Sequence, residues 1–416
     1  MSAPPPSLVA PPPRHGRDFP VLDTLRAVGA LAVLTTHATF WSGDYLRHGV
    51  LGTLFARLDV GVALFFVLSG FLLARPWLVA AMRAEPGPAP ALGVYAQRRF
   101  LRIVPLYVVT VVVALVFIDE NAGLGAVDWL STLLMLDTIS GTLFPAGLTQ
   151  MWSLAAEVMF YLGLPALMAL MLGRAPVWRA GRFWSVLLGL AALNVWWLVD
   201  GAARAGRLAT DGAPLQWLPS YLTWFGVGLL LAAAHALDSA GRGTRLTRAL
   251  RRLAGQPGAC WTVAGALLVV SATPLAGPTM FTAPDTGDLL VKNLLYAAVA
   301  LSVVLTGIWP TEGSTYARAA SARPLRHLGW ISYGIFCLHL PVLHLVMWTT
   351  GWELFEGHGP EIWLLALLGS VVAAEVAYRV VERPVLLWEE RRRSARVARS
   401  SHPATTTTAS SGTSAR

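Results

Sequence analysis

VLDTLRAVGALAVLTTHATF, residues 21–40, is long and apolar enough to cross a bilayer as a helix, which takes about 20 residues. Arg26 and His37 lie inside this stretch. An ionisable side chain at membrane depth costs roughly 2.5 kcal/mol or more, so such residues usually mark a site. At about 100° and 1.5 Å per residue, the two side chains share one face of the helix and stand roughly 16 Å apart along its axis. The helix therefore places a cation near one leaflet and a titratable imidazole toward the other.

The composition of the whole chain agrees with a membrane protein. Hydrophobic residues make up 55% of the 416 residues and charged residues only 13%, against about 25% in soluble domains. The mean hydropathy is +0.57. We predict an all-α fold, a polytopic membrane helix bundle of about ten transmembrane helices. The predicted spans are 21–40, 59–79, 103–118, 151–172, 183–200, 217–236, 258–275, 289–309, 328–349 and 361–382.

The basic residues indicate how the bundle is oriented. The net charge is +9, and most arginines fall in segments that lie on one side of the membrane if the N-terminus is cytoplasmic. Segment 119–150, on the other side, has no basic residue and carries four carboxylates. This asymmetry predicts that both termini are cytoplasmic. It also explains the positive charge as a signal for membrane topology. Nucleic acid is therefore not expected as a partner, and the lipid bilayer is.

The chain ends differ in composition from the middle. Residues 1–18 are Pro-rich and residues 391–416 are basic and then rich in Ser and Thr, so both are predicted to be disordered. A single membrane domain is expected over 19–390. Its first span carries polar residues without a small-residue cleavage site, which indicates a retained helix rather than a signal peptide. The apolar stretch Trp129–Leu136 predicts a short helix at the membrane interface.

The second and third spans offer two further features. Ser69 and Gly70 lie in the middle of FFVLSGFLL, where small residues let neighbouring backbones approach and where Ser69 is also a candidate pocket residue. Arg99 and Arg102 lie three apart in RRFLRIVP and share a helical face. They are either plain positive-inside anchors or a phosphate clamp, because the arginine fork matches phosphate oxygens.

The fourth span begins MWSLAAEVMFYLGLP and places Glu157 one turn after Ser153. A carboxylate in apolar surroundings has to pair with a cation, bond to an imidazole or take up a proton. Glu157 is therefore either half of an interhelical ion pair or a group that orients or acidifies a catalytic histidine. Asp23, three residues before Arg26, is expected to pair with Arg26 along the first helix.

The ninth span, HLGWISYGIFCLHLPVLHLVMW, holds His339 and His344. A lone histidine in a span is often only a hydrogen-bonded packing residue. Histidine pairs sometimes bind a metal, but no HExxH motif or Cys/His cluster supports one, so no metal is expected. Cys260 and Cys337 are expected to be buried thiols without a disulfide. The chain also lacks GxSxG, GxxxxGK[ST] and GxGxxG motifs, so nothing indicates flavin, haem or nicotinamide.

In order along the chain, these motifs resemble the integral-membrane acyltransferase-3 family. The resemblance rests on LDTLRA followed by His37, FFVLSGFLL, RRFLRIVP, WSLAAEVMFYLGLP, SYGIFCLHLP and the final ERP, and it covers about residues 20–390. Its most specific parts are the Arg-x10-His spacing of Arg26 and His37 and the Arg-x-x-Arg pattern of Arg99 and Arg102. The chain departs from the family where Leu338 stands before His339, because a Trp-His pair is frequent there. The added extracytoplasmic esterase-like domain that some members carry is not expected.

The resemblance implies an enzyme that moves an acyl group, often acetyl, from cytoplasmic acyl-coenzyme A to a hydroxyl of a carbohydrate or glycosylated small-molecule acceptor. The implied site residues are His37 and Glu157 for catalysis and Arg26, Arg99 and Arg102 for coenzyme A. Ser69, Ser153, Tyr333 and His339 are weaker candidates for substrate or pocket residues. An imidazole titrates near neutral pH and suits deprotonation of an alcohol. Direct transfer and a covalent acyl-imidazole intermediate both remain open.

Two other classes fit parts of the pattern. Ten spans with buried Arg, His and Glu also suit a proton-coupled secondary transporter or a flippase of an envelope precursor. Against a carrier, the sequence has no inverted repeat and no pair of interrupted helices. A sensor or scaffold without turnover leaves the Arg-x10-His and Arg-x-x-Arg patterns unexplained.

Overall fold

The computed structural model describes residues 19–82, 91–140, 144–173, 177–208, 212–279 and 282–400. These residues form helices joined by loops, and none of them lies in a β-strand, which confirms the predicted all-α class. The predicted disordered N-terminus, 1–18, lies outside the described residues, as does 401–416. In the predicted tail, α20 (Arg383–Ser400) continues helical backbone past the predicted domain end at residue 390.

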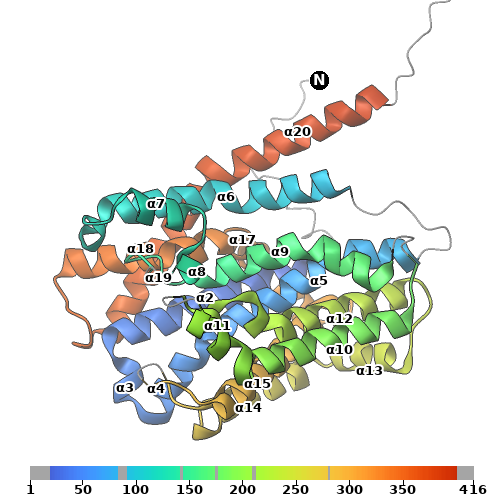
Figure 1. Cartoon of the computed structure of the whole chain (residues 1–416), viewed down its shortest axis with the longest axis horizontal. Helices are drawn as coiled ribbons and strands as arrows, with labels where there is room; N and C mark the ends of the chain where they lie inside the picture. The colour runs from blue at the N-terminus through green and yellow to red at the C-terminus, as the bar shows by residue number, and fades with distance from the viewer. Residues whose placement is uncertain are drawn as a thin grey trace, which may run out of the picture.

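Each predicted span overlaps one long helix. These are α2 (Pro20–Ser42), α5 (Val60–Met82), α6 (Leu92–Phe117), α9 (Met151–Leu172), α10 (Ala180–Trp196), α12 (Leu222–Ser239), α14 (Pro257–Ser271), α15 (Thr286–Ile308), α18 (Ser332–Thr350) and α19 (Gly359–Ala377). Shorter helices join them: α3 (Asp44–Arg47), α4 (Gly49–Ala56), α7 (Ala126–Leu133), α8 (Asp137–Ser140), α11 (Ala202–Leu208), α13 (Arg245–Ala254), α16 (Thr315–Ala320) and α17 (Arg323–Trp330). Figure 1 shows α2 and α5 in the middle of the bundle and α20 projecting from it beside α6.

By length and composition, eight helices of the described chain suit a membrane span, and the bent pair α13–α14 makes a ninth. The first predicted span, α2, is not among them, although its 23 residues reach about 34 Å. The reason is its content of polar side chains. In the structure α2 packs against α5, α15, α17, α18 and α19, so protein rather than lipid surrounds it. A helix in that position tolerates polar groups that a lipid-facing helix does not.

The most extensive contact between two helices of the described chain joins α5 to α12. Gly228 of α12 faces α5 so closely that an added Cβ would lie 2.3 Å from the carbonyl oxygen of Val67. On α5, a Cβ at Gly70 would lie 2.5 Å from the carbonyl oxygen of Phe225. Gly70 thus fills the packing role that the sequence indicated for the Ser69–Gly70 pair. The two backbones lie in direct contact at the level of Ser69.

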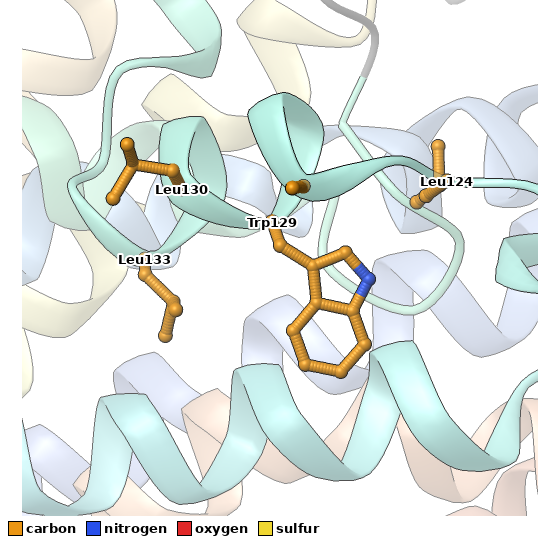
Figure 2. A pocket seen from close by; sticks show the side chains of 5 residues that line it. Leu124, Trp129, Leu130 and Leu133 are labelled. Atoms are coloured by element: carbon orange, nitrogen blue, oxygen red, sulfur yellow. The ribbon is translucent and has the colours of Figure 1, made fainter.

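Two short helices run beside the spans. The amphipathic, arginine-rich α13 meets α14 at 91°, so it turns away from the direction of that span. A short helix overlaps the predicted stretch Trp129–Leu136 but lies three residues earlier, as α7, and Met135 after its end has a left-handed backbone conformation. Side chains of α7 and Leu124 line an open apolar groove of about 490 Å³. Figure 2 shows the indole of Trp129 pointing from α7 toward the helix that runs beneath it.

The α5–α12 contact gives a stability prediction. Gly228→Ala should destabilise the protein by roughly 1–3 kcal/mol, as overpacked cores do, because the new methyl meets backbone that has little room to shift. Thermal unfolding of purified protein in detergent, followed by size-exclusion chromatography, measures the loss. Gly163→Ala on α9 is the control, since nothing lies within 4 Å of a Cβ there. Equal melting temperatures for the two variants would contradict the close contact.

Candidate active site

A cavity of about 260 Å³ opens beside the C-terminal part of α2. His37 and Thr36 of α2, Ser153 of α9, Phe336 of α18 and Lys292 of α15 are among its lining residues. Four helices that are far apart in sequence therefore converge around one imidazole. The predicted catalytic residue His37 and the predicted pocket residue Ser153 share this cavity.

The hydrogen bonds of His37 define its tautomer. Its Nδ1 lies 2.8 Å from the carbonyl oxygen of Val33 and 3.2 Å from Nε2 of His339. Because a carbonyl oxygen only accepts, Nδ1 carries the proton. The same argument gives His339 an Nδ1–H, which donates to the carbonyl of Phe336 at 2.7 Å. His339 Nε2 is then an acceptor for His37, and His37 Nε2 keeps a free lone pair, with no partner among the described residues.

A charged pair stands in the wall of the same cavity. Lys292 Nζ lies 2.7 Å from Oδ2 of Asp59, and the hydroxyl of the buried Tyr296 donates to Oδ1 of that carboxylate. Arg57 also lines the cavity, but its Nη2 donates to the carbonyls of Ala276 at 2.9 Å and Gly277 at 2.5 Å. Asp59 and Arg57 come from the short 3-10 turn Arg57–Asp59 that precedes α5.

A second polar cluster lies one helical turn from this cavity along α9. Oε1 of Glu157 accepts hydrogen bonds from the hydroxyls of Ser69 on α5 and Tyr161 on α9. Arg99 of α6 stacks over Tyr161, with its guanidinium carbon 6.0 Å from the ring centroid. The interhelical ion pair and the imidazole partner expected for Glu157 are therefore replaced by two hydroxyl donors. Glu157 and Ser69 lie on the side of the site that holds Arg26, Arg99 and Arg102, which we call the arginine side. His37 forms no hydrogen bond with Glu157 or Ser69.

The three predicted arginines differ in their partners. Arg102 Nη1 lies 2.6 Å from Oε2 of Glu382, whose side chain is 4% exposed, and its guanidinium lies 5.6 Å from the ring centroid of Tyr333. Arg26, by contrast, has no hydrogen bond or ion pair with any described residue, although Arg102 and Glu157 lie within electrostatic range. The Nε of Arg99 is buried without a hydrogen-bond partner. Two cations on this side of the bundle thus keep free donors.

The element that supplies Glu382 has an unusual geometry. After α19 the chain makes a π-helical turn, Tyr378–Glu382, and then enters α20. This turn packs against α6, which carries Arg102. The sequence predicted no role for Glu382, although the final ERP motif begins with it. An acidic residue inside an apolar span was the signal available for it.

The structure corrects one predicted pair. Asp23 does not form an ion pair with Arg26; its Oδ2 accepts from Nε of Arg326 at 3.3 Å and from Nε1 of Trp330 at 3.2 Å. Both donors belong to α17, which lies so close to α2 that a Cβ at Gly329 would meet the carbonyl oxygen of Asp23 at 1.9 Å. Nearness in sequence favoured Arg26, but side chains three apart on one helix often point to different neighbours.

The predicted residues thus fall into two groups. His37, His339 and Ser153 gather at the cavity, and Arg26, Arg99, Arg102, Glu157, Ser69 and Tyr333 gather on the arginine side. Four residues of the site were not predicted from the sequence: Asp59, Gln150, Tyr161 and Lys292. Lys292 is the single lysine among the 32 Lys and Arg residues, and this rarity was the available indication that it has a specific role. The described part of the chain holds no group of three or more His, Cys, Asp or Glu residues that would bind a metal.

Fold and site together define a polytopic helical membrane protein with a pair of histidines, His37 and His339, in its interior. The chain belongs to the acyltransferase-3 family, because residues 19–379 match the family model described as an acyltransferase domain. The motifs predicted this membership. With its apolar helices and its membrane acyltransferase relatives, the chain is a multi-pass integral protein of the bacterial inner membrane.

Curated proteins of several kinds are similar to this chain. Peptidoglycan O-acetyltransferase OatA of Listeria monocytogenes is 26% identical over 394 residues, which cover 89% of this chain and 56% of that protein. The chain thus spans just over half the length of this relative. Acyltransferase MdmB of Streptomyces mycarofaciens is 27% identical over 414 residues, or 95% of this chain and 97% of that protein. Nodulation protein 10 of Rhizobium leguminosarum is 24% identical over 403 residues, with 89% and 94% covered. No solved structure matches the chain.

The Arg102–Glu382 pair gives a second stability prediction. Glu382→Ala should destabilise the protein by about 3 kcal/mol or more, because removing one partner of a buried pair leaves the other charge uncompensated. The melting temperature in detergent reports the loss. Arg204→Ala is the control: its pair with Asp200 is exposed and should contribute less than about 1 kcal/mol. A Glu382→Ala variant as stable as the control would show that Arg102 finds another partner.

Proposed function

We propose that this protein is a membrane O-acyltransferase. It transfers an acyl group, with acetyl as the expected one, from cytoplasmic acyl-coenzyme A to a hydroxyl of a carbohydrate or carbohydrate-containing acceptor. Family membership supports acyl transfer, and the name of the Listeria relative, a peptidoglycan O-acetyltransferase, supports an oxygen acceptor on a carbohydrate. The observation that carries the proposal is the free Nε2 of His37 in the wall of a cavity.

In this mechanism His37 is the general base. Nε2 takes the proton of the acceptor hydroxyl as its oxygen attacks the thioester carbonyl, the carbon–sulfur bond breaks, and the proton passes to the leaving thiolate. When Nε2 is protonated, Nδ1–H becomes a stronger donor to the Val33 carbonyl and to His339 Nε2, both already within 3.2 Å. These two acceptors stabilise the imidazolium. His339 is thus a positioning residue.

The arginine side is the proposed donor site. Arg26 and Arg99 carry guanidinium groups that are free of ion pairs with described residues, and such forks suit the phosphates of coenzyme A. Arg102 contributes from its position against Glu382 and Tyr333. With both termini cytoplasmic, as the arginine distribution predicts, this side faces the cytoplasm, where acyl-coenzyme A is made.

Glu157 links the two sides in this proposal. It lies one turn of α9 from Ser153, which lines the cavity, and it lies within electrostatic range of Arg26. Its carboxylate balances the cations and, through Tyr161, holds the ring on which Arg99 stacks. We therefore assign Glu157 to the path of the thioester arm rather than to proton transfer at His37.

An acyl-imidazole intermediate on Nε2 is the other route open to the same geometry. It splits the transfer into two steps, with coenzyme A leaving before the hydroxyl attacks. Both routes need Nε2 unprotonated and Nδ1 bound to Val33, so they share the same requirements at His37.

The first test of the proposal is His37→Ala. Loss of the base should lower acetyl transfer by about 10²–10⁴-fold while the protein still folds. Turnover of labelled acetyl-coenzyme A by purified protein in detergent measures the effect. His344→Ala is the matched control, because His344 lies on the same helix as His339 but packs edge-to-face against Trp41 and does not line the cavity. Full activity of His37→Ala would remove the proposed base and both routes with it.

The second test concerns the donor site. Arg99→Ala should raise the Michaelis constant for acetyl-coenzyme A by about tenfold, the value of one charged hydrogen bond. Its stability should change little, since Arg99 has no ion pair with a described residue. Arg102→Ala should weaken the binding of acetyl-coenzyme A. It should also lower the melting temperature, because it breaks the ion pair with Glu382. Arg98→Ala, one residue away and paired with Glu389, is the control. Reduced turnover with unchanged donor affinity would instead favour a packing role for Arg99.

A further inference from the structure

One residue of the cavity lining, Lys292, takes no part in the proposed proton transfer or in donor binding. Lys292 is the only lysine of a chain in which every other basic residue is arginine. It lies on α15, and its ammonium is held 2.7 Å from Asp59 and 5.1 Å from the ring centroid of Tyr296. Both side chains of the pair are still accessible, with 32% of Lys292 and 37% of Asp59 exposed. Lys292, Asp59 and His37 line the same cavity.

The Lys292–Asp59 pair is held in position, and the ammonium of Lys292 still has N–H groups that can donate hydrogen bonds. Asp59 is fixed from the other side by the hydroxyl of Tyr296, a residue that is fully buried. An ammonium has three N–H donors, and Asp59 occupies only one of them in the described structure. Lysine presents its donors at a single atom that rotates freely, whereas the planar fork of arginine matches carboxylate and phosphate. A lysine here therefore suits hydroxyl oxygens.

Two other residues of the cavity point to the same kind of ligand. Gln150 is 2% exposed; its Nε2 donates to the carbonyl of Cys337 at 2.9 Å, which fixes the amide, and its Oε1 is left without a hydrogen-bond partner. Trp152 adds an aromatic side chain to the lining. Donors, acceptors and an aromatic surface occur together around a volume of 260 Å³. That volume is below the roughly 300–1,000 Å³ of sites for drug-sized ligands, so it suits about one ring.

We propose that Lys292, held by Asp59, is the recognition residue for the acyl acceptor, and that this acceptor presents a sugar ring. One hydroxyl of the ring faces His37 and a second hydroxyl accepts a hydrogen bond from Lys292. This inference rests on the proposed function, because it assigns the acceptor side of the same cavity. Arg57 suits this role less well, since its side chain is only 2% exposed and its Nη2 is bound to two backbone carbonyls.

The single lysine makes the test direct. In the wild-type chain, an amine-selective reagent such as formaldehyde with borane has one side-chain target besides the amino terminus. The protein in detergent is labelled alone, with coenzyme A, with cyclohexanol, or with methyl glycosides of glucose and N-acetylglucosamine, and the Lys292 peptide is quantified by mass spectrometry. At least one glycoside should slow labelling of Lys292 without slowing that of the amino terminus. Coenzyme A and cyclohexanol should not protect it.

Variants give an independent measurement. Lys292→Met should raise the Michaelis constant for the protecting glycoside by about tenfold and leave that for acetyl-coenzyme A unchanged, as expected for one charged hydrogen bond. Lys292→Arg should recover only part of the loss, because its fork does not reproduce the single-atom donor. Arg204→Met removes another cation paired with a carboxylate, outside the cavity lining, and is the control.

The outcomes separate the inference from the proposed function. If the wild-type protein turns over acetyl-coenzyme A but no glycoside protects Lys292, the recognition role is wrong and the acyltransferase proposal stands. If Lys292→Met changes the donor constant instead, the role is also wrong. If a glycoside protects Lys292 but no turnover occurs, the sugar site is supported and the acyltransferase proposal fails. Should Lys292→Met fail to accumulate, protection of the wild-type lysine decides the matter.

Discussion

The bundle depends on one constraint: a charged or strongly polar group at membrane depth is costly unless it has a partner, and in the described chain Arg26 and Arg99 are the cations of the site that keep free donors. Water is absent there, so an unpaired group is costly. Asp23 satisfies the constraint through Arg326 and Trp330, and Arg102 does so through Glu382. Each of these bonds joins two helices that are distant in sequence. The polar groups therefore specify which helices are neighbours, while apolar contacts supply most of the packing.

The same constraint explains why α2 lies where it does. Its first half carries Asp23 and Arg26 and its second half carries His37, so polar groups occur along most of its length. Enclosure by five helices gives these groups protein neighbours along its length. A helix enclosed in this way connects the arginine side to the cavity through protein, and α9, which packs against α5, carries Glu157 on the arginine side and Ser153 in the cavity lining. In the proposed reaction the nucleotide stays at one end and the acyl group reaches the other.

The sequence predicted the helices well, because apolar length is a local property. Residues 151–172, for example, were assigned as a span and form α9 with those bounds. It predicted partners poorly, because a partner depends on how helices pack. Glu157 was expected to meet a cation or an imidazole and meets two hydroxyls instead. Asp23 was paired with its nearest cation in sequence and bonds to α17. Tautomers are equally non-local: the lone pair of His37 is defined only once the Val33 carbonyl and His339 are in place.

The π-helical turn at Tyr378–Glu382 shows how a register change alone creates a binding partner. A π turn contains one residue more than an α turn, so it rotates all that follows by about 100° around the helix axis. Arg379 in this turn is 68% exposed, whereas Glu382, three residues later, is 4% exposed and meets Arg102. The π turn thus contributes to which side chain of this segment faces the interior and meets Arg102. A chain with one residue more or fewer in this turn would present a different side chain to the guanidinium of Arg102, without any substitution in the Arg-x-x-Arg pattern.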